Sequence, residues 1–231
     1  MGKLIVNFDS SVSGAILPYD HQYMLYSSLL NQIDHVDSGL ARLIHTEKTK
    51  PLFVMSQIIP AGNRSFTPDG IKADRFVLIF VSDDEKILDR IDRSFSEFGH
   101  LEVGPMVLNY HSSTRLAVPS PPTTPELVTR SPIILKGNGK YISFGDSNFS
   151  DILKSAILRK AMAVGGSQAE SISFLRIVEG RRKAFTVHSA KIPCSIIKFI
   201  IDADRTILDT ILIYGIGAKT QMGFGMIEVS R

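Results

Sequence analysis

The stretch "RFVLIFVSDDEKILDRIDRSF", residues 75–95, decides the local fold of this chain. Its apolar beginning, "RFVLIFV", has the length and composition of a buried strand. Ser82, followed by Glu85 three positions later, forms a capping-box pattern, which predicts that a helix starts here. A strand that leads directly into a helix fixes one half of a mixed α and β unit, and the remaining elements can be read outward from it.

The first half of the chain reads as strand, helix, strand, strand, helix, strand. "KLIVNF" is an apolar strand, and apolar residues at three- and four-residue spacing between Tyr23 and Val36 predict an amphipathic helix. Gly39 interrupts this helix, and "LARLIH" continues it as a short helical piece. "PLFVMSQII" and "HLEVGPMVLNY" supply the remaining strands on either side of the opening stretch.

The second half repeats this order. "SPIILK" and "KYISF" predict an opening strand or hairpin, and "NFSDILKSAILRKAMAV" predicts a helix. "ESISFLRIVEG" and "KAFTVHSAKIPCSIIKFII" predict two strands, "DRTILDTILIYG" a short helix and "MIEVS" the last strand. Two βαββαβ units in tandem predict an α+β fold of two ferredoxin-like domains.

Prolines mark the expected boundary between the two units. "VPSPPTTPELVTRSP", residues 118–132, holds five of the eleven prolines, and proline at this density favours an extended connector. We therefore expect an N-terminal domain at residues 1–117, a linker at 118–131 and a C-terminal domain at 132–231.

Composition narrows the classes of function. With 44% hydrophobic residues and no run long enough to cross a membrane, the chain is predicted to be globular and cytoplasmic. Cys194 is the only cysteine, which argues against disulfides and against zinc sites with several cysteines, and its apolar neighbours favour a buried structural thiol. Residues 1–117 carry 11 Lys and Arg against 14 Asp and Glu, whereas residues 118–231 carry 15 against 9. The basic second half suits an anionic partner such as RNA.

The stretch "GIGAKTQMGFG", residues 215–225, resembles a phosphate-binding loop but matches neither common nucleotide motif. A Walker loop needs glycine directly before its lysine, and Ala218 stands there; the GxGxxG fingerprint fails because Thr220 stands in place of the third glycine. What remains is a loop of four glycines with Lys219 and Thr220, which could hold a phosphodiester backbone. A plain glycine-rich turn is the alternative.

Several stretches taken together resemble the CRISPR-associated endoribonuclease family that cuts repeat transcripts into guide RNAs. They are "LPYDHQYMLYSSLLNQI", "LARLIH", "KPLFVMSQI", "VTRSPIIL" and "GIGAKTQMGFGMIEV", and they occur in order along the whole chain. The glycine-rich stretch is similar to a hallmark of the wider RAMP superfamily of RNA-binding ferredoxin-like proteins. The resemblance implies metal-independent cleavage, in which the ribose 2′-OH attacks the neighbouring phosphate and leaves a 2′,3′-cyclic phosphate and a 5′-OH end.

The resemblance also implies a catalytic site. His45 stands where the family keeps its catalytic histidine, and a lysine follows in the family pattern, for which Lys50 is favoured over Lys48. Some members present a tyrosine facing the histidine; Leu30 stands at that position here, and Tyr26 lies one helical turn earlier. If His45 is not the catalyst, His21 and His35 are the next candidates. No metal ligand set and no cofactor are expected.

RNA contacts are expected mainly in the second half. The glycine-rich loop contributes Gly215, Gly217, Lys219, Thr220, Gly223 and Gly225. "VEGRRKAF" is predicted to place Arg181, Arg182 and Lys183 at a hairpin tip beside a turn at Gly180, against a phosphate backbone. Weaker candidates are Arg159, Lys160, Lys136 and Lys140.

Two other functions stay open from the sequence. One is a non-catalytic RNA-binding subunit of a CRISPR effector complex, and the other is a ferredoxin-like regulatory or small-ligand module. The expected partner is repeat RNA, with an effector complex as a further candidate, and the chain is expected to be a monomer or a homodimer.

Overall fold

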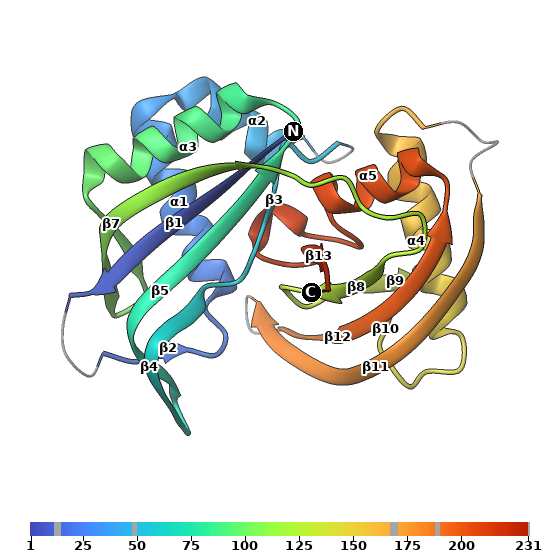
Figure 1. Cartoon of the computed structure of the whole chain (residues 1–231). Coiled ribbons are helices and arrows are strands. Elements are labelled where there is room, and N and C mark those ends of the chain that lie inside the picture. Colours follow the sequence, from blue (N-terminus) through green and yellow to red (C-terminus); the bar gives the residue numbers. More distant parts are fainter. Residues whose placement is uncertain (12–14, 48–49, 167–170, 188–189, 231) are drawn as a thin grey trace.

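The two halves of the chain form two antiparallel sheets that stand side by side, each covered by its own helices (Figure 1). This computed structural model describes residues 1–11, 15–47, 50–166, 171–187 and 190–230. The strand orders below are those of tandem ferredoxin-like folds, as the sequence predicts.

The first sheet follows the order β2-β5-β1-β7-β6, and β3 and β4 also pair with β5. Its core order β4-β5-β1-β7 is that of a βαββαβ unit, with the first strand in the middle. The elements are β1 (Gly2–Ser10), β2 (Leu17–Pro18), α1 (Gln22–Val36), α2 (Ser38–Thr46), β3 (Val54–Met55), β4 (Ile59–Thr67), β5 (Gly70–Ser82), α3 (Glu85–Phe98), β6 (His100–Val103) and β7 (Met106–Ala117).

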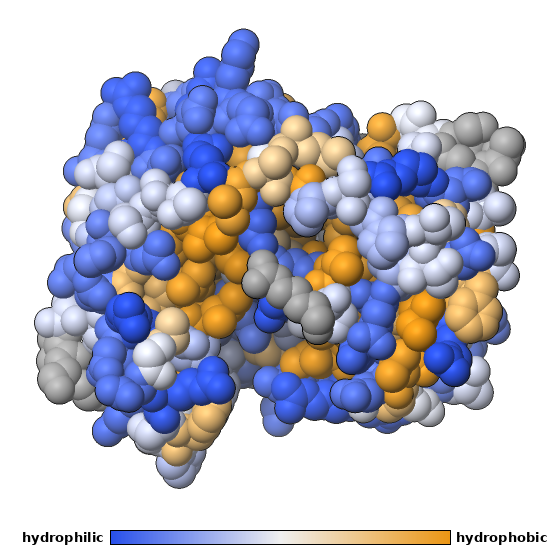
Figure 2. All heavy atoms as spheres, viewed as in Figure 1, coloured by the Kyte–Doolittle hydropathy of each residue, from blue (hydrophilic) through white to orange (hydrophobic). Residues whose placement is uncertain are grey.

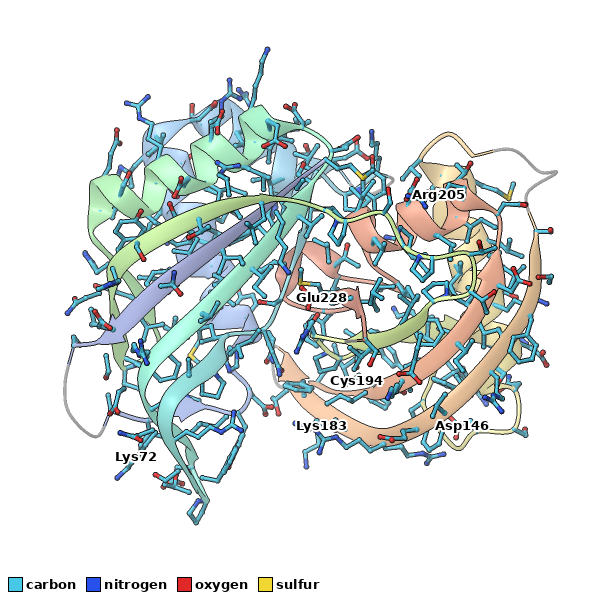
Figure 3. All side chains as sticks on the ribbon, viewed as in Figure 1. Lys72, Asp146, Lys183, Cys194, Arg205 and Glu228 are labelled. Atoms are coloured by element: carbon cyan, nitrogen blue, oxygen red, sulfur yellow. The ribbon has the colours of Figure 1, made fainter. Side chains whose placement is uncertain are left out.

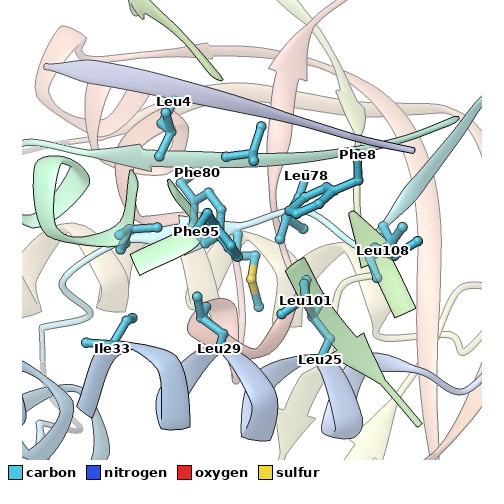
Figure 4. Packing of buried hydrophobic residues seen from close by; sticks show 14 of the residues in the cluster. Leu4, Phe8, Leu25, Leu29, Ile33, Leu78, Phe80, Phe95, Leu101 and Leu108 are labelled. Carbon is cyan, nitrogen blue, oxygen red and sulfur yellow. The ribbon is translucent and has the colours of Figure 1, made fainter. Parts of the chain in front are cut away.

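Alternation along β1 builds the core of this half. Leu4, Val6 and Phe8 are fully buried, and their neighbours in sequence are only half-buried, because successive side chains of a strand point to opposite faces. Figure 4 shows Leu4 and Phe8 packed with Phe80 and Phe95 above α1. The rings of Phe8 and Phe95 meet edge to face with centroids 5.3 Å apart. This packing fixes α1 against the sheet and so sets where its free face points.

The helix within residues 75–95, α3, has a different N-cap from the one that the capping-box pattern predicted. Its N-cap is Asp84, whose carboxylate accepts a hydrogen bond from the Lys86 N–H at 2.9 Å. Ser82 is still the last residue of β5, and its hydroxyl donates to the Leu52 carbonyl at 2.7 Å. The prediction that Ser82 caps the helix was therefore wrong: β5 continues to Ser82, and the N-cap lies two residues later, at Asp84.

The second sheet follows the order β11-β12-β8-β13, again with the first strand of the unit in the interior. A separate hairpin of β9 and β10 lies between its first strand and first helix. The elements are β8 (Glu126–Thr129), β9 (Leu135–Gly137), β10 (Lys140–Ile142), α4 (Phe149–Ala163), β11 (Ile172–Val187), β12 (Ala190–Ala203), α5 (Arg205–Tyr214), the 3₁₀ turn η1 (Thr220–Met222) and β13 (Ile227–Val229).

The opening strand of the second sheet lies inside the segment predicted as a linker. β8 pairs with both β12 and β13, whereas "SPIILK" and "KYISF" contribute only the small hairpin. Four of the prolines in this segment precede Glu126, so they remove no hydrogen-bond donor from β8. The connector is therefore shorter than predicted, and it is held to the second half by Arg205, whose guanidinium donates to the Pro121 carbonyl at 2.9 Å.

The predicted hairpin at Gly180 does not exist. β11 runs without a turn from Ile172 to Val187 and pairs with β12 on both sides of Gly180, which lies opposite Ile197. A Cβ at Gly180 would lie 2.5 Å from the Phe144 ring, so this glycine permits close packing and makes no turn. The pairing of β11 with β12 extends to Val187 and Ala190, and residues 188–189 are outside the described residues.

The contact between the two halves combines apolar and ionic parts. Figure 2 shows apolar surface gathered along the junction, and Val54, Ile79 and Val81 of the first half form one buried cluster with Met226. Glu228, labelled near the junction in Figure 3, forms ion pairs with Lys3 of β1 and with Arg130. Burial opposes the charge of Glu228, but its two cationic partners outweigh that effect and lower its pKa below the ordinary value.

Candidate active site

A cavity of about 570 Å³ lies between the two halves and is lined by residues from both. One wall comes from α1, α2 and the segment that follows α2, and the other comes from α4 and the glycine-rich loop. The lining residues are Tyr23, Tyr26, Ser27, Leu30, Asn31, Ile44, His45, Glu47, Pro51, Lys160, Gly217, Ala218, Lys219, Thr220, Gln221 and Met222. The cavity therefore brings together His45, Tyr26 and the front of the glycine-rich loop.

The four glycines give the loop its path. All four have positive φ angles, between 71° and 81°, a region that side-chain-bearing residues rarely adopt. A Cβ at Gly225 would lie 2.1 Å from the Ile216 carbonyl oxygen, and one at Gly217 would lie 2.3 Å from that of Ile134. Only glycine lets the backbone of the loop pack this closely on itself and on residues 133–134.

Only part of the loop faces the cavity. Gly217, Lys219 and Thr220 line it, whereas Gly215, Gly223 and Gly225 are buried behind it. Lys219 itself adopts a left-handed backbone conformation with φ 61°, just before the 3₁₀ turn. The front of the loop therefore offers one cation, one hydroxyl and a tightly turned backbone to a ligand, while the remaining glycines hold it in shape.

His45 lies in the last turn of α2 and is exposed. The helix starts with Asp37, whose side chain accepts a hydrogen bond from the Leu40 N–H at 2.9 Å, and it is anchored by the buried Leu40 and Ile44. His45 follows Ile44 directly, and this anchoring carries it to the mouth of the cavity with its ring open to a ligand.

The alternative histidines are placed differently. His21 is buried and uses both ring nitrogens, one 2.8 Å from the Pro18 carbonyl oxygen and one 3.2 Å from the Ile58 amide nitrogen. Burial lowers its pKa to about 4, so it stays neutral, and we assign it a structural role at the start of α1. His35 is exposed at the end of α1, beside the Phe98 ring, and does not line the cavity.

Tyr26 lies on the face of α1 that lines the cavity, one turn before Leu30, which also lines it. Burial raises the pKa of Tyr26 above its ordinary value, so that the phenol keeps its proton at neutral pH. A protonated phenol is a hydrogen-bond donor, which fits contact with an anionic oxygen.

Lys50 does not line the cavity, although its neighbour Pro51 does. Its ammonium group lies 3.2 Å from the Asp83 carboxylate and 5.3 Å from the centre of the Tyr214 ring. The Tyr214 hydroxyl donates to the same carboxylate at 2.5 Å. Hydrogen bonding of the Lys50 ammonium to Tyr214, and then to the Asp83 carboxylate, raises the pKa of Lys50, although burial opposes this shift. Lys50 is thus tied into a contact between the halves, beside the site.

The basic segment of β11 also lies outside the cavity. Arg182 donates to the Phe144 carbonyl oxygen and to the Asp146 carboxylate, both at 2.5 Å. Arg181 and Lys183 share the opposite face of the strand, and Figure 3 shows Lys183 at the end of β11 that approaches the first half. The structure does not bring these three residues to His45.

Other chemistry finds little support among the described residues. No group of three or more His, Cys, Asp or Glu there could hold a metal ion, and no described helix is long and apolar enough to cross a membrane. Cys194 is buried, as predicted, and burial raises its pKa to about 12, which disfavours the reactive thiolate.

Lys160 lines the cavity, although the sequence marked it only as a weaker candidate for RNA contact. Tyr23, Ser27 and Leu30 of α1 also line the cavity, but nothing in the sequence indicated that this face of the helix would meet the glycine-rich loop.

Comparisons with known proteins show which families and proteins this chain is similar to. Residues 118–229 match the family "CRISPR associated protein Cas6, C-terminal". The chain is 24% identical to the "CRISPR-associated endoribonuclease Cas6 1" of Methanocaldococcus jannaschii, over 92% of this chain and 87% of that protein. It is 22% identical to the "Putative CRISPR-associated endoribonuclease-like protein Cas6nc" of Pyrococcus horikoshii, over 93% of each chain.

Solved structures show the same fold. A structure described as "An RAMP protein binding different RNA substrates" superposes with a TM-score of 0.88 at 22% identity and covers 100% of both chains. The product of a Cas6-related gene from Pyrococcus furiosus also gives a TM-score of 0.88, at 20% identity, over 100% of this chain and 99% of that one.

Proposed function

We propose that this chain, whose residues 118–229 match the Cas6 C-terminal family, is an endoribonuclease that cuts CRISPR repeat transcripts into guide RNAs. One observation carries the proposal: His45, Tyr26 and the front of the glycine-rich loop, which are far apart in sequence, line one cavity. A histidine beside a phosphate-binding loop is what cleavage of a phosphodiester by proton transfer requires.

The proposed reaction needs no metal ion. His45 accepts the proton of the ribose 2′-OH as that oxygen attacks the neighbouring phosphorus. The bond from phosphorus to the 5′ oxygen breaks, that oxygen takes up a proton from solvent, and His45 returns its own proton to solvent, leaving a 2′,3′-cyclic phosphate and a 5′-OH. Tyr26 donates a hydrogen bond to the phosphate oxygens, and Lys219 and Thr220 hold the backbone on the opposite wall. Lys50 joins the site if bound RNA draws its ammonium group from Asp83.

A second candidate function is that the chain binds repeat RNA without cutting it. Leu30 favours this reading, because it lines the cavity at the position where some family members present a tyrosine. Both candidate functions have RNA as the partner and place the protein in the cytoplasm, where transcripts are made. In both, the bound RNA is available to an effector complex. They differ only in whether His45 transfers a proton.

Cleavage in excess EDTA separates the two readings. The substrate is the repeat RNA of the same genome, and its partner is the same RNA with a 2′-deoxyribose on the 5′ side of the cut. We expect one cut per repeat in the first RNA and tight binding without cleavage of the second. Cleavage of the deoxy RNA, or a strict need for magnesium, would contradict attack by the 2′-OH. Tight binding with no cleavage of either RNA would establish the non-catalytic function.

A further inference from the structure

Lys160, near the end of α4, lies where two hollows of the surface meet. It lines the cavity that holds His45, called the first hollow below, and it also lines a second, smaller hollow of about 230 Å³. Gly217 and Ala218 of the glycine-rich loop are shared by both hollows as well. The two hollows therefore adjoin at these loop residues and at Lys160, which they share.

The second hollow is basic. Lys136 and Arg159 line it together with Lys160, and the other lining residues are apolar or glycine: Ile134, Leu135, Ala156, Ala163, Gly217 and Ala218. The charged and titratable groups of the first hollow are Tyr23, Tyr26, His45, Glu47, Lys160 and Lys219. Glu47 is the one carboxylate among the lining residues, and it accepts a hydrogen bond from the Lys50 N–H at 3.2 Å. The combined surface is complementary to a chain of negative charges.

Lys160 has no carboxylate partner. Within the described part of the chain, no Asp or Glu oxygen lies within 4.0 Å of its ammonium group, whereas Lys50 and Lys198 each form an ion pair. Burial lowers the pKa of Lys160 to about 8. The pKa values of Lys50 and Lys198 are instead raised by their hydrogen-bond partners. A half-buried cation without a partner is unfavourable until an anion binds beside it.

We propose that Lys160 binds a phosphate of the RNA at the junction of the two hollows, so that the second hollow continues the RNA path away from His45. This inference rests on the proposed function for the identity of the anion. Lys160 then contributes positive charge beside the phosphate that is cut, and Lys136 and Arg159 contact the backbone beyond it. In the free protein the ammonium group of Lys50 is paired with Asp83, and Lys50 lines neither hollow.

The proposal predicts that RNA affinity depends on pH. In the free protein Lys160 loses its proton as the pH rises through about 8, and the neutral amine does not attract phosphate. Bound phosphate stabilises the ammonium form and raises its pKa. Affinity therefore falls above pH 8, by at most about tenfold per pH unit for one proton.

The test measures the affinity of the 2′-deoxy repeat RNA between pH 6.5 and 9.5 and across a range of salt. The variants are Lys160→Met, Lys160→Arg and, as a control, Lys154→Met, which changes a lysine of the same helix that lines neither hollow. We expect Lys160→Met to lower the slope of log affinity against log salt by about 0.7 and to remove the fall above pH 8. Lys160→Arg should keep the slope and also remove the fall, because arginine stays charged.

The outcomes separate this inference from the proposed function. If Lys160→Met keeps the parent's salt slope and its fall above pH 8, the Lys160 inference is overturned, whether or not the parent cleaves RNA. If the parent shows the fall, and both Lys160 variants remove it, the inference holds even for a parent that never cleaves. The same changes in Lys154→Met would overturn it, since they would report an effect of charge on α4 in general.

Discussion

The sequence predicts RNA binding both at the glycine-rich loop and at the basic segment of β11, but only the loop lines the cavity with His45. The loop turns on four glycines with positive φ and lies at the cavity with His45. The segment from Gly180 to Lys183 runs straight through the middle of a strand, and Arg182 is already paired with Asp146. Glycine has two different uses here: in the loop it bends the backbone, and in β11 it makes room for the Phe144 ring.

The largest effect that would sharpen this contrast is on the cavity side, at His45. If His45 transfers a proton, His45→Ala should lower the single-turnover cleavage rate by roughly 10²–10⁴-fold, while RNA affinity changes little. Single-turnover rates and equilibrium binding measured on the same RNA check this. The matched control is His35→Ala, an exposed histidine of α1 outside the cavity, which should cut at the parent rate. Equal rates for the parent and His45→Ala would place the chemistry elsewhere.

The next effect compares the glycines themselves. Gly225→Ala forces a Cβ to within 2.1 Å of a backbone oxygen at φ 71°, and we expect it to lower the free energy of unfolding by about 3 kcal/mol. Gly180→Ala should cost less, because the Cβ meets the Phe144 side chain, which can rotate away. Gly99→Ala is the control for backbone strain alone, since its φ is 69° and nothing lies within 4 Å; about 1 kcal/mol is expected.

Denaturant unfolding of the three variants measures these differences. A cost at Gly180 equal to that at Gly225 would remove the distinction between a glycine that bends the backbone and one that makes room for a ring.

The smallest effect concerns the charges of β11. Arg181 and Lys183 share the face opposite Arg182 and remain candidates for RNA binding outside the cavity. We expect Arg181→Ala with Lys183→Ala to lower the salt slope of RNA affinity by about 0.7 for each phosphate that is no longer neutralised. Arg182→Ala should leave the slope unchanged, because Asp146 already neutralises this side chain. A larger slope change in Arg182→Ala than in the double variant would reverse this assignment.

Local signals in the sequence predicted much of this molecule. Apolar spacing and the capping-box pattern predicted all five described helices, and the repeated order of elements predicted both ferredoxin-like units. His45 and Tyr26 came from a resemblance, and the cavity they share with Lys219 and Thr220 supports that choice. These features depend on residues close in sequence or on a family pattern.

The errors arose where distant residues decide the outcome. β8 is a strand because β12 and β13 pair with it on either side, and four residues after a run of prolines do not show this. Gly180 was predicted as a turn because the Phe144 ring that fills the space above it lies 36 positions away. Lys160 is a candidate for RNA contact because α4 borders two hollows, which the sequence does not show. Lys50 lies beside Asp83 and Tyr214 and outside the cavity, which the sequence does not show either.

The proline-rich connector has a consequence for the thermodynamics of RNA binding. Prolines restrict the conformations of the segment, and the bond from Arg205 to the Pro121 carbonyl fixes its middle, so the two halves are held at a high effective concentration of each other. The entropic cost of bringing His45 opposite the glycine-rich loop is then met when the protein folds. Bound RNA need not repeat that cost, and more of its contact free energy appears as affinity.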